Sequence, residues 1–169
     1  MKRIFQLLGL LIILGIVYLV ISGQKMQTIT TDIEILAPPE KVWSIITDIE
    51  KWQQWCPTIN ASEGEAAEGS TVTITMMSKE AGKDGPKYSP TIIQMDAPTY
   101  FHWRAHMISG FIFTNEKIIE LEETATGTKL THKETFKGLM AALMKAQTEK
   151  GVPPMLNTMN DALKKLAEQ

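Results

Sequence analysis

Residues 128–169, TKLTHKETFKGLMAALMKAQTEKGVPPMLNTMNDALKKLAEQ, contain the change of periodicity that decides the fold. From Thr128 to Phe136 the side chains alternate between two faces, which is the pattern of a β-strand. Beyond Gly138 apolar residues recur at helical spacing and form two stripes. The stripes consist of Leu139, Met140, Leu143 and Met144, and of Met155, Met159, Ala162 or Leu163, and Leu166. A strand is therefore followed by a helical tail whose apolar face needs a partner.

The segment Gly151-Val-Pro-Pro154 lies between the two stripes. Glycine ends helices readily, and the residue before a proline avoids the helical region. We therefore expect a break in the helical tail at this segment.

Upstream of Thr128 the chain alternates in short runs that are separated by turn residues. Two short helices are expected between Pro39 and Trp55, after the first run, and a turn is expected over Lys79–Pro86. Such runs joined by tight turns indicate an antiparallel, strongly curved sheet of six or seven strands, whose concave face the tail helix covers. The runs upstream of Thr128 span residues 27–36, 70–78, 88–95, 100–108 and 111–122.

Three phrases of this chain, in this order of elements, resemble the SRPBCC superfamily, which includes START-like lipid-binding domains, plant pathogenesis-related allergens and polyketide cyclase/dehydrase-like proteins. They are Ala37-Pro-Pro-Glu-Lys-Val-Trp43, Trp52-x-x-Trp55-x-Pro57 and Gly127-Thr-Lys-Leu-Thr-His-Lys-Glu134-x-Phe-x-Gly138, followed by the terminal helix. The resemblance covers about residues 27–168. It implies an α+β protein with a helix-grip fold, in which a curved antiparallel sheet wraps around a long C-terminal helix and leaves a hydrophobic cavity.

Residues 1–25 have the composition of a membrane anchor that precedes this domain at 26–169. Ile4–Ile21 contains 18 residues with Gln6 as the only strongly polar one, which is long enough to cross a bilayer once as a transmembrane helix. Lys2 and Arg3 precede it, so the positive-inside bias predicts a cytoplasmic N-terminus and an extracytoplasmic domain at the cell membrane. A cleaved signal peptide, with Ser22 and Gly23 near the cut, is the alternative.

The distribution of charge and motifs excludes several classes of function. The only charged residues before position 26 are three basic ones, so residues 26–169 carry 14 basic and 19 acidic side chains. A surface of that charge repels phosphates, and no nucleic-acid partner is expected. We also expect no cofactor and no metal, because phosphate loops, paired cysteine ligands and His-Glu-x-x-His are absent from the sequence.

Strand parity predicts which side chains face the cavity. In the last strand His132 and Glu134 share the inward face with Phe136, which makes them candidates for a polar pair, for ligand contact or for acid–base catalysis. Lys117 is expected at the cavity rim with its ammonium group in water. The predicted ligand-binding residues are Val72, Ile74, Met76, Phe101, Trp103, Met107, Phe113, Lys117, His132, Glu134, Phe136, Met155 and Met159.

These expectations leave three hypotheses for function. The first is a membrane-anchored domain that binds a hydrophobic or amphipathic small molecule or lipid in the cavity. The second is a polyketide cyclase/dehydratase-like enzyme that uses His132 and Glu134 as general acid and base. The third is an interaction module whose core is filled, for which a cavity below about 100 Å³ would be evidence, because ligand pockets usually measure about 300–1,000 Å³.

Overall fold

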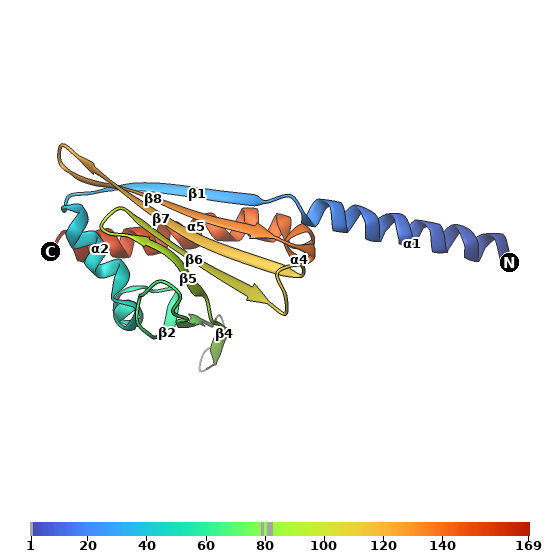
Figure 1. Ribbon diagram of the computed structural model, residues 1–169, viewed down its shortest axis with the longest axis horizontal. Helices are drawn as coiled ribbons and strands as arrows, with labels where there is room; N and C mark the ends of the chain where they lie inside the picture. The colour runs from blue at the N-terminus through green and yellow to red at the C-terminus, as the bar shows by residue number, and fades with distance from the viewer. Residues whose placement is uncertain (1, 79, 81–82) are drawn as a thin grey trace.

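The structure is a computed structural model that describes residues 2–78, 80 and 83–169 of the chain (Figure 1). A long N-terminal helix is followed by strands and short helices and then by the C-terminal helix. The elements are α1 Lys2–Gly23, β1 Gln27–Ile35, α2 Pro39–Thr47, η1 Ile49–Lys51, α3 Trp52–Trp55, β2 Ile59–Glu63, β3 Thr73–Met77, β4 Asp84–Tyr88, β5 Thr91–Asp96, β6 Tyr100–Met107, β7 Phe113–Thr124, β8 Gly127–Lys137, α4 Leu139–Leu143 and α5 Lys145–Ala167.

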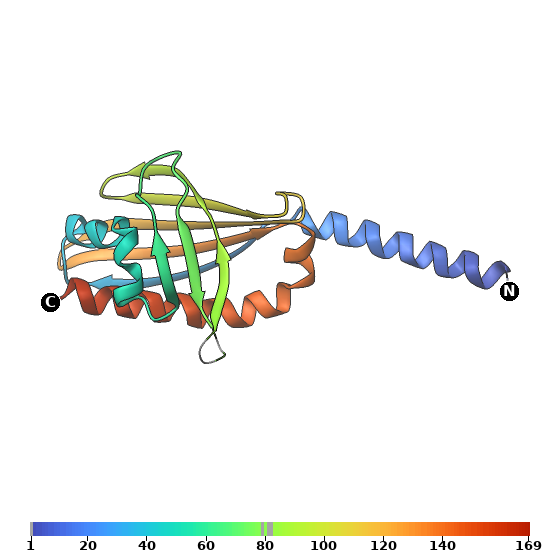
Figure 2. The same cartoon turned by 90° about the horizontal axis from the view of Figure 1, so that it is seen from below.

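The strands form two antiparallel sheets in the described part of the chain, whereas the sequence predicted one. The larger has the order β1-β8-β7-β6-β5 and the smaller the order β2-β3-β4, whose strands run across those of the larger sheet in Figure 2. The sheets meet where the backbone N–H of Val72 donates to Pro90 and that of Ile92 donates to Ser70. The α+β architecture with a long C-terminal helix is as predicted.

Two strands of the smaller sheet were missed by the sequence analysis. β2 is short and largely polar, and β4 includes Asp84, Gly85 and Pro86, which were assigned to a turn over Lys79–Pro86. Residues 79, 81 and 82 of that predicted turn lie outside the described residues. At Gly85 the backbone approaches β3 so closely that an added Cβ would lie 2.4 Å from the carbonyl oxygen of Met76. Tertiary pairing therefore makes a strand of a sequence with turn composition.

The predicted break of the tail helix at Gly151–Pro154 is wrong. α5 continues through Pro153 and Pro154, and the helical tail is interrupted instead at Met144, between α4 and α5. A proline removes a hydrogen bond to the carbonyl four residues earlier. Those carbonyls belong to Glu149 and Lys150, which are exposed residues, so solvent can replace the lost hydrogen bonds and the helix continues.

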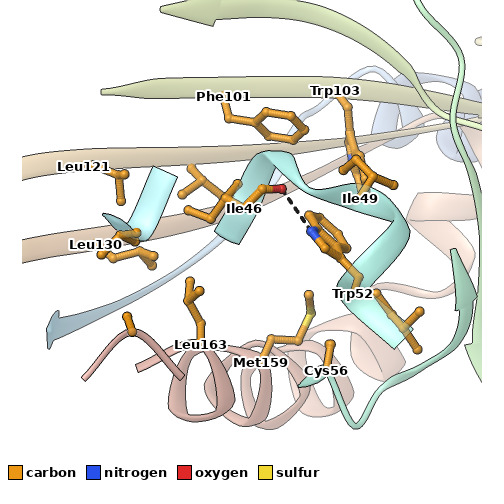
Figure 3. Close-up of a cluster of buried hydrophobic side chains, with 14 of the residues drawn as sticks. Ile46, Ile49, Trp52, Cys56, Phe101, Trp103, Leu121, Leu130, Met159 and Leu163 are labelled. Carbon is orange, nitrogen blue, oxygen red and sulfur yellow. Dashed lines mark hydrogen bonds between the residues drawn. The ribbon is translucent and has the colours of Figure 1, made fainter. Parts of the chain in front are cut away.

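The hydrophobic core lies between the larger sheet, the C-terminal half of α5 and the short helices α2, η1 and α3 (Figure 3). Trp52 is buried at its centre, where its indole Nε1–H donates to the carbonyl of Ile46 at 2.9 Å. Its ring packs on that of Trp103, with 5.3 Å between centroids. Leu163 and Met159 reach this cluster from α5, as Figure 3 shows, so the helix is packed tightly against the sheet at its C-terminal end.

α1 extends away from the domain along the long axis of the molecule (Figures 1 and 2). Among the described residues it is the one helix long and apolar enough to cross a membrane, with a mean hydropathy of 2.8 over Ile4–Gly23. Its end is fixed to the domain, because the backbone N–H of Gly138 donates to the carbonyl of Gly23 at 2.7 Å. An added Cβ on Gly23 would lie 2.9 Å from the carbonyl carbon of Gly138, so only glycine permits this contact.

The packing of α5 predicts the cost of removing a core side chain from it. Leu163 is 4% exposed, so Leu163→Ala leaves a cavity and should lower the free energy of unfolding by about 2–5 kcal/mol. Leu36→Ala is the matched control, because Leu36 is 64% exposed and its truncation should change stability by less than about 0.5 kcal/mol. Urea denaturation in detergent, followed by tryptophan fluorescence, measures both. Equal effects of the two substitutions would contradict the described packing of α5.

Candidate functional site

A pocket of about 240 Å³ lies between the sheets and the N-terminal half of α5. Its wall is mostly apolar and is built by residues of β3, β4, β6, β7, β8 and α5. The lining residues are Met76, Pro86, Lys87, Tyr88, Ala105, His106, Met107, Phe113, Asn115, Glu134, Phe136, Val152 and Met155. This volume is slightly below the usual range of ligand pockets and well above that of a filled core.

The burial of the lining residues shows which end of the pocket is deep. Ala105, Glu134 and Phe136 are buried and form its floor. Lys87 and Met107 are exposed and belong to its rim. The pocket therefore passes from a wet mouth to an interior that carries one carboxylate.

Six of the thirteen predicted ligand-binding residues line this pocket. They are Met76, Met107, Phe113, Glu134, Phe136 and Met155. Five others pack in the closed core away from it, namely Val72, Ile74, Phe101, Trp103 and Met159. The free space around Met159, Trp52 and Leu163 is only about 10 Å³. The space beneath α5 is thus open at one end of the helix and filled at the other.

The remaining two predicted residues, Lys117 and His132, lie in a buried polar network directly behind Glu134. The Lys117 ammonium is 2.6 Å from Glu134 Oε1 and 2.6 Å from His132 Nε2. His132 Nδ1 is 2.9 Å from Asn160 Oδ1, and Asn160 Nδ2 donates to Thr31 Oγ1 at 3.0 Å. The network thus connects β7, β8, α5 and β1.

The protonation of His132 follows from its partners. An ammonium group can only donate, so Nε2 accepts from Lys117 and the ring proton sits on Nδ1, which donates to Asn160. Burial, and then the charge of Lys117, hold the pKa of His132 well below its ordinary value of 6.5, while the Asn160 hydrogen bond opposes them. His132 is therefore a neutral imidazole with both nitrogens engaged inside the protein.

The predicted position of Lys117 at a wet rim is wrong. The residue is 2% exposed, and its ammonium lies 5.7 Å from the centroid of the Trp103 ring. Burial of this charge is tolerated because a carboxylate and an imidazole nitrogen satisfy it. His132 and Glu134 are both inward-facing as parity predicts, but Lys117 bridges them in place of a direct contact.

Glu134 is the one member of this network that also lines the pocket. Its second oxygen, Oε2, accepts from the side-chain amide of Asn115, which lines the pocket as well. The Glu134 carboxylate thus lies between the ammonium group of Lys117 and the side-chain amide of Asn115. The floor of the pocket therefore contains polar groups, and the negative charge of Glu134 there is balanced by Lys117.

Two residues of the site, one in the polar network and one in the pocket wall, were not predicted from the sequence. Asn160 lies on the inner face of α5 between Leu156 and Leu163. A polar residue in an otherwise apolar helical stripe could have indicated a buried hydrogen-bonding role. Tyr88 lines the pocket from β4, a strand that the sequence analysis missed; it had assigned Tyr88 to the start of the run over residues 88–95. Burial raises the pKa of Tyr88, whose hydroxyl donates to the sulfur of Met76 at 3.6 Å. Within the described ranges there is no cluster of three metal-ligating side chains.

The neutral, buried state of His132 predicts a pH dependence of stability. The unfolded chain protonates this histidine near pH 6.5, whereas the native state resists protonation, so stability is fully present above about 6.5 and falls as the pH is lowered. His132→Gln should flatten this decline by up to about 1.4 kcal/mol per pH unit between roughly pH 6.5 and 5. Burial also lowers the pKa of His102, so the His132→Gln variant keeps a smaller pH dependence of stability. Denaturation profiles of the wild type, His132→Gln and the exposed control His106→Gln measure the effect; identical profiles for all three would contradict it.

The buried ion pair predicts that its two members are coupled. Lys117→Met leaves Glu134 buried without its counter-charge and should cost about 3–5 kcal/mol of stability. The double variant Lys117→Met/Glu134→Gln removes both charges and should recover a large part of that loss. A double-mutant cycle of unfolding free energies tests this, and strictly additive losses would show that the two side chains do not depend on each other.

Comparisons with known proteins place this geometry in a family. Residues 26–168 match the profile of the family described as "Polyketide cyclase / dehydrase and lipid transport". A search of curated proteins gave no match.

Several solved structures share the fold at low sequence identity. Protein CV1439 from Chromobacterium violaceum has a TM-score of 0.69 at 15% identity, covering 84% of this chain and 98% of its own. Ara h 8.0201 has a TM-score of 0.67 at 17% identity, covering 85% and 98%. The di-domain ARO/CYC protein BexL from the BE-7585A biosynthetic pathway has 0.69 at 14%, covering 90% of this chain, which spans about half (53%) of that protein. The chain thus belongs to the polyketide cyclase/dehydrase and lipid transport family of the SRPBCC superfamily, as its sequence phrases indicated.

Proposed function

We propose that this protein is a membrane-anchored binding domain that takes up the apolar part of an amphipathic small molecule or lipid. The observation that carries the proposal is the pocket between the sheets and α5. Methionine and aromatic side chains dominate its wall, and compensated polar groups lie at its floor. Flexible methionine side chains at Met76, Met107 and Met155 suit ligands of variable shape.

The chemistry of the pocket favours entry with the apolar end first. Glu134 already shares its charge with Lys117, so a second carboxylate near the floor would lack a counter-ion. Lys87 and His106 are exposed residues of the pocket lining, and their side chains can meet an anionic or polar head group at the mouth. Each methylene group buried in the interior would contribute about 0.8 kcal/mol to binding.

The size of the pocket limits what it can enclose. At about 240 Å³ it accommodates part of a lipid or a small ring system, with the rest of the molecule outside the mouth. This arrangement suits temporary holding or presentation of a ligand more than its full enclosure.

Membrane anchoring is the second component of the proposal. α1 has the length and hydropathy of a single span, and Lys2 and Arg3 precede its apolar residues. By the positive-inside bias the N-terminus would be cytoplasmic and the binding domain extracytoplasmic. The domain would then work at the surface of the membrane that holds it.

The enzymatic alternative finds no particular support in the geometry. His132 does not line the pocket, and its two ring nitrogens are engaged by Lys117 and Asn160. A general acid or base must reach the proton that it transfers, and only Glu134 of the proposed pair faces the pocket. We therefore infer binding, with the His132 network as its structural support.

Ligand retention tests the proposal. Val152 is a half-buried pocket residue on α5, so Val152→Trp should fill the pocket and reduce the fraction of protein that carries a co-purified ligand about tenfold. Gln147→Trp, exposed on the same helix and outside the pocket lining, is the matched control and should retain it. Native mass spectrometry of the full chain released from detergent measures the bound mass. Wild-type protein without bound mass, or equal retention in both variants, would contradict the proposal.

A further inference from the structure

Exposed apolar side chains gather at one end of the domain. Outside α1, nine large hydrophobic residues of the described chain are exposed, and six of them belong to the connection that follows α1, to the end of β6 and the β6–β7 connection, or to the end of α4 and the residue after it. These six define the α1-proximal surface. They are Met26, Met107, Ile108, Phe111, Leu143 and Met144.

Backbone hydrogen bonds bring these segments together beside α1. The N–H groups of Leu139 and Met140, at the start of α4, donate to the carbonyls of Phe111 and Ile112 at 3.2 and 2.9 Å. The preceding residue, Gly138, donates to Gly23 at the end of α1. The α1-proximal surface therefore lies beside the point where α1 joins the domain.

Ile108 is the most exposed of these side chains. It is 90% exposed and adopts a φ of +65°, a backbone conformation that is rare for a β-branched residue. Phe111, three residues later, is 52% exposed. Two large apolar side chains at the tip of one connection, without a covering element, are typical of a surface that contacts an apolar partner.

The orientation of α1 indicates what that partner is. α1 leaves the domain along its long axis, from the end at which α4 lies (Figures 1 and 2). If α1 spans a bilayer, as proposed above, the α1-proximal surface faces the lipid head groups at the base of the span.

The basic residues at this end of the domain suit contact with an anionic lipid surface. Lys25 and Lys137 are exposed there, although the domain as a whole is acidic. The carboxylates of Glu116 and Glu149, on adjoining elements, are paired with Arg104 and Lys145. Basic side chains around apolar ones favour binding to the interface of a membrane that contains anionic lipids.

We propose that the α1-proximal surface docks on the bilayer, with Ile108 and Phe111 inserted among the lipid head groups. This inference rests on the proposed anchoring by α1. Met107 belongs to this surface and also to the rim of the pocket. An apolar ligand therefore passes between the bilayer and the pocket beside Met107 without crossing bulk water.

The test is the depth of fluorescent labels in the reconstituted full chain. Single cysteines replace Ile108, Phe111, Leu36 or Leu14, and each is labelled with an environment-sensitive fluorophore. The only native cysteine, Cys56, is 2% exposed, and the wild type serves as the labelling blank. Vesicles of phosphatidylcholine and phosphatidylglycerol carry a lipid-borne quencher, and iodide serves as the water-soluble quencher. Leu36 is the matched control because it is exposed and follows β1, about 30 Å along the strand from α1.

Docking predicts that labels at Ile108→Cys and Phe111→Cys are quenched by lipid at least about threefold more than the label at Leu36→Cys, and less by iodide. Labels at positions 108 and 111 that behave like the one at 36 would overturn the docking. Shielding from both quenchers would also overturn it, since a protein would then cover the surface. The label at Leu14→Cys, in the middle of α1, reports anchoring separately: an unquenched label there refutes the span, whatever the label at position 108 shows.

Discussion

The ammonium group of Lys117 is the charge around which the interior of this protein is arranged. In an apolar core an ammonium needs acceptors close by, and Glu134 and His132 supply them at 2.6 Å each. His132 extends the network to Asn160 of α5, and Asn160 extends it to Thr31 of β1. One buried charge thereby fixes the position of the C-terminal helix across three strands of the larger sheet.

This network also separates two regions beneath α5. On one side Trp52, Met159 and Leu163 leave almost no free volume, so the helix is packed on the sheet. On the other side lies the pocket, and Glu134 belongs to both the network and the pocket floor. Because the packed half and the network hold the helix, the other half can remain open without loss of the fold. A packed scaffold with an apolar opening is the arrangement that the proposed binding of an apolar ligand requires.

The sequence predicted those features that depend on local pattern. Alternation in β8 correctly placed His132 and Glu134 inside, and the three family phrases correctly indicated the architecture. The sequence did not predict that the ammonium group of Lys117 is buried. Its burial depends on the carboxylate of Glu134, which lies opposite Lys117 in the β7–β8 pair. The continuation of α5 through Pro153 and Pro154 depends on the exposure of Glu149 and Lys150, whose carbonyls lose a hydrogen bond to each proline, and β4 depends on pairing with β3. The alternation of side chains predicted which faces of the strands point inward. It could not show that Phe101 and Trp103 pack in the closed core while Phe113 and Phe136 line the pocket.

The proposed ligand binding requires that the space beneath α5 admits a guest molecule at one end only, and the methyl resonances of the methionines test this most directly. In the full chain with ¹³C-labelled methionine methyl groups, decanoate is added as the probe. We predict that the resonances of Met76, Met107 and Met155, which line the pocket, shift with saturation, while that of Met159 in the packed half stays unchanged. A shift of Met159 equal to theirs, or no saturable shift at all, would contradict the account.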